Sequence, residues 1–66
     1  MADLTLIRQA ERAGFVIIWR NGRAYFAHIH DERNPRNWSF PFPDEDAAAI
    51  AALAYAETLQ LLAIGA

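Results

Sequence analysis

The sequence lacks cysteine altogether, and this absence limits how the chain can be stabilised. Without cysteine there is no disulfide and no metal site built from thiolates. The 66 residues are enough for one domain, and we treat residues 1–66 as that single domain. So small a domain buries only about 60% of the surface that its unfolded chain exposes. Apolar residues, at 55% of the sequence, must therefore supply the stability, and binding to a partner would add to it.

Lysine is also absent, so all six basic side chains are arginines. The net charge is −2, whereas a dedicated nucleic-acid-binding protein usually carries a basic surplus. We therefore do not expect nucleic acid as the main partner. The guanidinium group of arginine is suited to bidentate hydrogen bonding with carboxylates and phosphates. A GC-rich genome also favours arginine codons, and the sequence leaves both explanations open.

Long apolar runs are missing as well. The N-terminus is acidic at Asp3 and has no continuous apolar core of the kind that a secretory signal needs. The apolar C-terminal stretch is interrupted by Glu57, Thr58 and Gln60, so we expect no membrane span. A cytoplasmic location follows as the default prediction.

Glycine is scarce, and three glycines are too few for a phosphate-binding loop, but one of them is informative. Asn21-Gly22 separates two runs rich in β-branched and aromatic residues. Asn-Gly in a two-residue loop favours a type I′ turn, because both positions need positive φ. We therefore predict a β-hairpin over residues 15–30, with Trp19 opposite Ala24.

Helices are predicted on both sides of this hairpin. Residues 3–13 have apolar side chains at a helical spacing, with Asp3 as the cap and Gly14 as the left-handed residue that follows. Residues 44–64 begin with three acids, which suit the positive end of the helix dipole, and Gly65 is expected to stop this helix.

Residues 31–42 connect the hairpin to the last helix. The stretch 31–36 is polar and reads as a loop, in which Pro35 forces Asn34 into an extended conformation. In the stretch 37–42 aromatic residues alternate with others, as in a strand, although Pro41 restricts it to a short edge strand or an extended segment. The predicted order is therefore α-β-β-β-α. We expect an α+β two-layer sandwich, an antiparallel three-stranded meander with both helices on one face.

The two faces of the hairpin differ in character. The larger and more aromatic face is assigned to the helices, and it holds Phe15, Ile17, Trp19, Ala24, Phe26 and His28. The second face is too apolar for a solvated surface, and exposed patches of this kind mark interfaces. The predicted partner-binding residues are Ile18, Arg20, Arg23, Tyr25 and Ile29 on this face, with Arg33 and Arg36 in the following loop. The alternative is that a loop, the third strand or the C-terminus covers the face.

Chemistry-bearing residues are few. His28 and His30 could share a metal ion if both lie on one strand, yet two ligands do not complete a site. His28 and Glu32 are a second possible pair, as the acid and base of a nuclease. The six acids at positions 31, 32, 44, 45, 46 and 57 could imitate nucleic-acid charge or simply be solvated. We predict no catalytic residue, no metal site and no cofactor.

The stretch Leu6–Val16, the Asn21-Gly22 turn and Phe26-Ala27-His28 together resemble the opening of HicA-type mRNA interferase toxins. That family shares the α-β-β-β-α order of double-stranded-RNA-binding domains, so the resemblance implies this layout and an RNA-binding module of a toxin–antitoxin system. The family's catalytic histidine follows the glycine turn, where this chain has Arg23, so the resemblance transfers no catalytic residue. The second helix is basic in the RNA-binding relatives and acidic here.

By type alone, the chain also resembles small phage anti-defence proteins such as anti-CRISPR inhibitors, which are compact and lack catalytic signatures. The sequence therefore predicts a non-catalytic interaction protein that occludes a larger protein partner or forms a homodimer. The alternative is a degenerate HicA-like or double-stranded-RNA-binding-like module, with His28 as acid or base and the arginines on phosphate.

Overall fold

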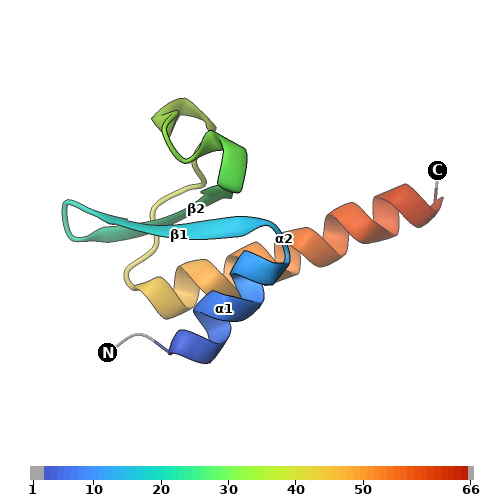
Figure 1. Cartoon of the computed structure of the whole chain (residues 1–66), viewed down its shortest axis with the longest axis horizontal. Coiled ribbons are helices and arrows are strands. Elements are labelled where there is room, and N and C mark those ends of the chain that lie inside the picture. The colour runs from blue at the N-terminus through green and yellow to red at the C-terminus, as the bar shows by residue number, and fades with distance from the viewer. Residues whose placement is uncertain (1–2, 66) are drawn as a thin grey trace.

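The structure, a computed structural model, describes residues 3–65, and it combines two helices with a two-stranded antiparallel sheet in an α+β fold. The elements are α1 (Leu4–Arg12), β1 (Phe15–Arg20), β2 (Arg23–His28), the 3-10 turns η1 (Ile29–Asp31) and η2 (Pro35–Asn37), and α2 (Glu45–Gly65). Figure 1 shows both helices on one side of the hairpin and the two 3-10 turns on the other side. Residues of the hairpin therefore face either the helices or the connection between β2 and α2.

The hairpin forms around the predicted turn. Asn21 has φ of 53° and Gly22 has φ of 74°, so both central residues adopt the positive φ that a type I′ turn requires. Arg20 pairs with Arg23 beside the turn, and the register places Trp19 opposite Ala24 as predicted. This turn fixes which side chains of β1 and β2 share a face, because a shift of one residue would move every side chain to the other side.

The end of β2 differs from the prediction. We expected the strand to reach His30, but it ends at His28, and Ile29 begins η1. The amide of Ile29 donates a hydrogen bond of 3.1 Å to the carbonyl oxygen of Gly14, which lies just before β1. This bond still follows the hairpin register, and the regular strand is lost where η1 begins, so His30 does not belong to β2.

The predicted third strand is the main correction. The sheet has two strands, and residues 37–42 run beside β2 with one isolated bridge, between Ala24 and Phe42. The amide of Ser39, rather than that of Phe40, donates to the carbonyl oxygen of Phe26 at 2.8 Å. The Ser39 hydroxyl then accepts from the Phe26 amide at 2.9 Å and donates to the Phe40 carbonyl at 2.8 Å.

This arrangement explains why a regular ladder does not form. A continuous antiparallel register from Ala24–Phe42 would place Phe40 opposite Phe26. Ser39 occupies that position instead, so the register slips by one residue. Pro41 has no N–H to donate, which also prevents a longer ladder. Phe40 consequently projects into solvent and is 85% exposed.

Both helices begin beside the predicted acidic residues, whereas the prediction that Gly65 stops α2 is wrong. Asp3 accepts a hydrogen bond of 2.9 Å from the Thr5 amide at the start of α1, and Gly14 has φ of 95° just after it. The Asp44 carboxylate accepts from the Ala47 amide at 2.7 Å at the start of α2. Gly65 is the last residue of α2, so this helix runs one residue further than predicted.

The core lies between the hairpin and the helices, as the assignment of the hairpin faces predicts. Phe15 is the large side chain that is buried most completely, and it packs with small residues of both helices. The buried residues of this cluster are Ala10, Phe15, Ala49 and Ala52, and Leu6, Ile7, Ile17, Phe26 and Ala56 pack around them. Alanines on α2 allow the helix to approach the sheet closely. The C-terminal end of α2 projects beyond the hairpin and α1 (Figure 1).

Candidate functional site

The outer face of the hairpin, on the side opposite the helices, is partly covered by the connection that contains η1 and η2. Ala27 is buried, while Val16, Ile18 and Tyr25 are half-buried. The Trp38 ring, just after η2, lies 5.4 Å from the Tyr25 ring between centroids. The connection therefore packs on this face and covers part of it, while Arg20 and Arg23 at its margin are exposed.

Arg20, Tyr25 and Trp38 form one contact cluster on this face, which we call the outer cluster. The guanidinium carbon of Arg20 lies 5.6 Å from the centre of the Trp38 ring, within the range of a cation–π contact. The Trp38 Nε1–H donates to the Glu32 carbonyl oxygen at 3.0 Å, which holds the indole in place. A guanidinium and two aromatic rings are thus arranged side by side at the solvent boundary.

The structure brings together only some of the predicted binding residues. Arg20 and Tyr25 belong to the outer cluster, and Ile18 is the strand partner of Tyr25. Arg23 is paired with Arg20 beside the turn, and both are exposed. Ile29 is exposed at the opposite end of the hairpin, so it does not belong to the cluster.

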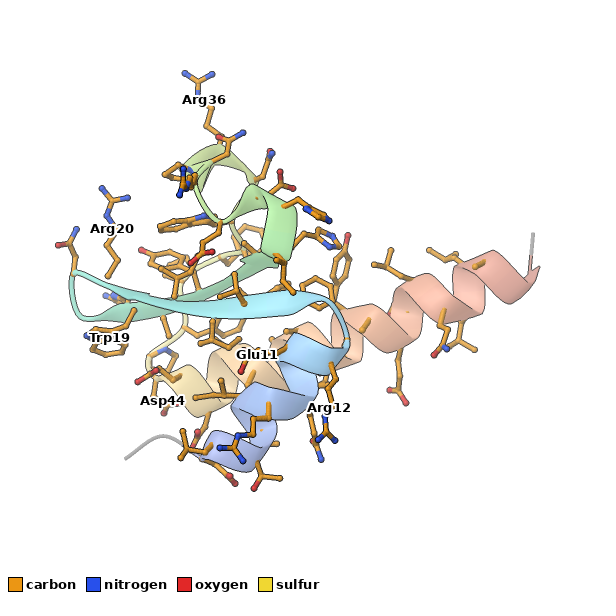
Figure 2. All side chains as sticks on the ribbon, in the orientation of Figure 1. Glu11, Arg12, Trp19, Arg20, Arg36 and Asp44 are labelled. Atoms are coloured by element: carbon orange, nitrogen blue, oxygen red, sulfur yellow. The ribbon has the colours of Figure 1, made fainter. Side chains whose placement is uncertain are left out.

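The remaining two arginines lie in the connection. Arg33 precedes η2 and Arg36 is within it, and both side chains are exposed. Figure 2 shows Arg20 and Arg36 extending away from the hairpin on the side opposite the helices. The side of the molecule that carries the outer cluster therefore also presents positive charge.

Trp38 is the member of the outer cluster that sequence reasoning missed. Its alternation with Phe40 and Phe42 suggested a single aromatic face, but the slipped register at Ser39 breaks that alternation. Pro41 was the available signal, because a proline within a run of strand-like residues indicates that pairing is interrupted there.

The two histidines are not arranged as metal ligands of one strand. His28 ends β2 and its ring lies 4.6 Å from that of Phe15, whereas His30 belongs to η1. Across residues 3–65, the structure has no group of three or more His, Cys, Asp or Glu side chains that could hold a metal ion. His28 is better described as part of an aromatic wall.

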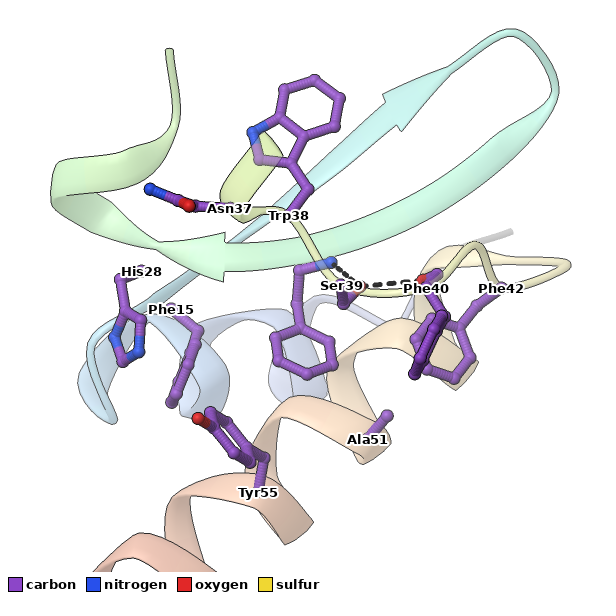
Figure 3. Close-up of a pocket in the computed structure, with 10 residues that line it drawn as sticks. Phe15, His28, Asn37, Trp38, Ser39, Phe40, Phe42, Ala51 and Tyr55 are labelled. Carbon is purple, nitrogen blue, oxygen red and sulfur yellow. Dashed lines mark hydrogen bonds between the residues drawn. The ribbon is translucent and has the colours of Figure 1, made fainter. Parts of the chain in front are cut away.

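That wall belongs to a pocket of about 500 Å³ on the helix side of the hairpin, which we call the inner pocket (Figure 3). It opens between β2, residues 37–42 and α2, and Phe40 stands exposed among its lining residues. The lining comprises Phe15, Phe26, His28, Asn37, Trp38, Ser39, Phe40, Phe42, Ala51 and Tyr55. Tyr55 ties α2 to this wall, with its ring 5.8 Å from that of Phe15 and 5.9 Å from that of Phe26.

Helix α2 also has an unusual composition. Over Glu45–Ala63 its mean hydropathy is 1.2, so by length and composition alone it could cross a membrane. Its first half, however, contributes Ala48, Ala49 and Ala52 to the buried core of the domain. The described residues leave the large apolar side chains of its second half exposed.

No protein-family model matches the chain, and comparison with curated proteins and with solved structures found no match either.

Proposed function

We propose that this protein is a non-catalytic interaction protein that binds an acidic surface of a larger protein, in the manner of small phage inhibitors. The observation that carries the proposal is the outer cluster, in which Arg20 is stacked on Trp38 beside Tyr25. Tyrosine, tryptophan and arginine are the residue types enriched at the energetic centres of protein interfaces. The partner-binding surface comprises this cluster with Ile18, Arg23, Arg33 and Arg36.

The chemistry of the cluster favours carboxylates. The Arg20 guanidinium lies over the Trp38 ring, and its planar set of N–H donors matches the bidentate geometry of a carboxylate. Arg20 and Arg23 face each other across the strands, and like charges in that position destabilise a hairpin. A carboxylate of the partner would relieve this repulsion. The exposed arginines of the connection would steer an acidic partner toward the surface.

Affinity capture with the purified chain tests this proposal. Cross-linked partners are identified from cells that express the chain, and their affinity is then measured with purified components. We expect Arg20→Ala to weaken binding at least tenfold, and Arg20→Lys to restore only part of the loss because an ammonium group lacks the planar fork. Arg8→Ala and Arg12→Ala on α1 are the matched controls, since both arginines are exposed on the helix side of the hairpin. Equal binding by Arg20→Ala and the controls would refute the proposed surface.

RNA binding is a second candidate, and the stacking of Arg20 on Trp38 favours it too, because bases stack on such aromatic and guanidinium planes. In that case the chain would be the RNA-binding module of a toxin–antitoxin system. Fluorescence anisotropy with single- and double-stranded RNA distinguishes the candidates. Binding at low salt that weakens steeply at moderate salt would support RNA. No binding at either salt concentration would eliminate it.

A further inference from the structure

The second half of α2 is the largest part of the molecule that the domain core does not explain. Leu61 and Leu62 are 69% and 66% exposed, and Leu59 and Tyr55 are exposed as well. Figure 1 shows this half of the helix projecting away from the hairpin and α1. The described residues therefore leave these leucines uncovered, as an apolar surface at one end of the molecule.

One stripe along α2 connects these leucines to the inner pocket. Ala51, Tyr55, Thr58 and Leu62 are spaced by four, three and four residues, the spacing of a helix–helix seam. Ala51 and Tyr55 line the inner pocket, and Leu62 lies two turns further along the same side. Alanine occurs at the pocket end of the stripe and leucine at the projecting end.

This order of small and large residues makes the stripe complementary to itself. When two such helices run antiparallel, the large end of each meets the small end of the other. Along the chain, Ala51 and Leu62 have the same midpoint as Tyr55 and Thr58. A single two-fold axis at that midpoint therefore places Ala51 opposite Leu62 of the other copy and Tyr55 opposite Thr58 of the other copy. The Thr58 hydroxyl already donates to the Ala54 carbonyl oxygen at 3.1 Å, so its burial would leave no unpaired donor.

We propose that a second copy of this chain covers the stripe, in a symmetric dimer in which the two α2 helices pack antiparallel. Leu62 of each copy lies opposite Ala51 of the other and enters its inner pocket, which Phe40 borders. Tyr55 of each copy lies opposite Thr58 of the other. The pocket of about 500 Å³ leaves room for the incoming side chain. No residue of the stripe belongs to the outer cluster, so the dimer does not rest on the proposed function, although Trp38 also lines the inner pocket.

The other exposed side of α2 is less suited to self-association. Ile50, Ala54 and Leu61 follow one another there, but Glu57 lies between Ala54 and Leu61. An antiparallel pair centred on this side would place each Glu57 opposite Ala54 of the other copy and bury both carboxylates close to the axis. Repulsion between buried like charges would oppose that dimer. Leu61 and Leu62 are neighbours with similar exposure, but only Leu62 is expected to contribute to the dimer.

Sedimentation equilibrium of the full chain measures the association. We expect a monomer–dimer equilibrium in the micromolar range, with Leu62→Glu raising the dissociation constant at least tenfold. Leu61→Glu is the matched control and should change it less than threefold. Circular dichroism confirms that both variants remain folded. A wild-type chain that stays monomeric at millimolar concentration would overturn the dimer, and so would equal weakening by the two variants.

Cross-linking tests the antiparallel arrangement independently. The described chain has no cysteine, so Ala51→Cys and Leu62→Cys each introduce one reactive thiol. A short bis-maleimide should join a mixture of the two variants and should not join either variant alone. Cross-linking of Leu62→Cys to itself would indicate a parallel pair and overturn the proposed geometry.

Vesicle flotation examines the competing occupant, a lipid bilayer. If zwitterionic vesicles carry the chain, and Leu61→Glu and Leu62→Glu both abolish flotation, the exposed half of α2 is a membrane anchor and the dimer proposal is wrong. We expect the chain to remain in the aqueous fraction.

Discussion

Phe15 is the residue on which the core depends most. It begins β1 directly after Gly14, and its ring contacts Phe26 at 5.5 Å and Tyr55 at 5.8 Å between centroids. The other buried residues of its cluster are alanines. Phe15 is thus the one large side chain that is fully buried in this cluster, and the larger apolar residues around it are only partly buried.

Truncation of Phe15 should therefore have a large effect on stability. Phe15→Ala is expected to lower the free energy of unfolding by about 3–5 kcal/mol, because it removes a buried ring and leaves a cavity. A domain of this length has only about 3–10 kcal/mol in total, so much of the variant should be unfolded. Urea denaturation followed by circular dichroism measures the change.

Phe40 provides the matched control for this prediction. It is the same residue type but 85% exposed, so Phe40→Ala should change the free energy of unfolding by about 0.5 kcal/mol or less. Similar losses for Phe15→Ala and Phe40→Ala would contradict the description of the core.

Among the elements, the extended segment 37–42 is held beside β2 partly by a side chain, because the Ser39 hydroxyl replaces a backbone hydrogen bond of a regular strand pair. Ser39 accepts the Phe26 amide hydrogen and donates to the Phe40 carbonyl, in place of the direct bond of a regular ladder. The segment holds Trp38 and Phe40 on either side of this anchor, and Trp38 belongs to the outer cluster. Ser39 thus positions residues of both candidate binding surfaces.

Ser39→Ala should release this segment. The half-buried Phe26 amide would lose its partner, which costs about 1–3 kcal/mol. We expect faster hydrogen exchange at the Phe26 amide and a changed fluorescence of Trp38 relative to the wild type. Gln9→Ala is the control, because Gln9 is an exposed residue of α1 that belongs to neither proposed binding surface and should be nearly neutral. An unchanged exchange rate at Phe26 in Ser39→Ala would show that the hydroxyl does not anchor the segment.

The whole molecule is elongated, with extents of 38 × 26 × 17 Å. The hairpin and α1 cover only the first half of α2, and the rest of this helix projects beyond them (Figure 1). The fold of a single copy and the association of copies should therefore depend on different parts of one helix.

Shortening the chain after Gln60 tests this separation. The removed part includes Leu61 and Leu62, which are mostly exposed, so the free energy of unfolding at low concentration should fall by about 0.5 kcal/mol or less. Thermal denaturation and the amide spectrum of the hairpin provide the measurement. Loss of the hairpin signals in the shortened chain would show that the projecting turns are needed for folding.

Much of the local structure was predictable from the sequence. Asn21-Gly22 predicted the turn and the strand register, and Asp3, Gly14 and Asn34 adopt the predicted conformations. The hairpin face assigned to the helices contains Phe15, Phe26 and Ile17 of the core cluster. Each of these features depends on residues close together in the chain or on simple alternation along a strand.

The candidate site was predictable only in part. Arg20 and Tyr25 were identified from their positions on the outer face, but Trp38 was assigned to an aromatic face with Phe40. The inner pocket and the exposed half of α2 were not anticipated. Both depend on where the segment 37–42 and the end of the hairpin lie relative to α2.

The sequence alone therefore determined the hairpin, its turn and the two ends of α1, because steric limits on φ and local hydrogen bonds act between neighbouring residues. Only the tertiary structure determined the conformation of residues 29–42. In this segment Ser39, instead of Phe40, bonds the backbone amide and carbonyl oxygen of Phe26 in β2. The slipped register then placed Trp38 under Arg20 and left Phe40 beside the inner pocket. The physical reason is that contacts between distant segments depend on which of several alternative pairings has the lowest free energy in the whole fold, and no local pattern records that balance.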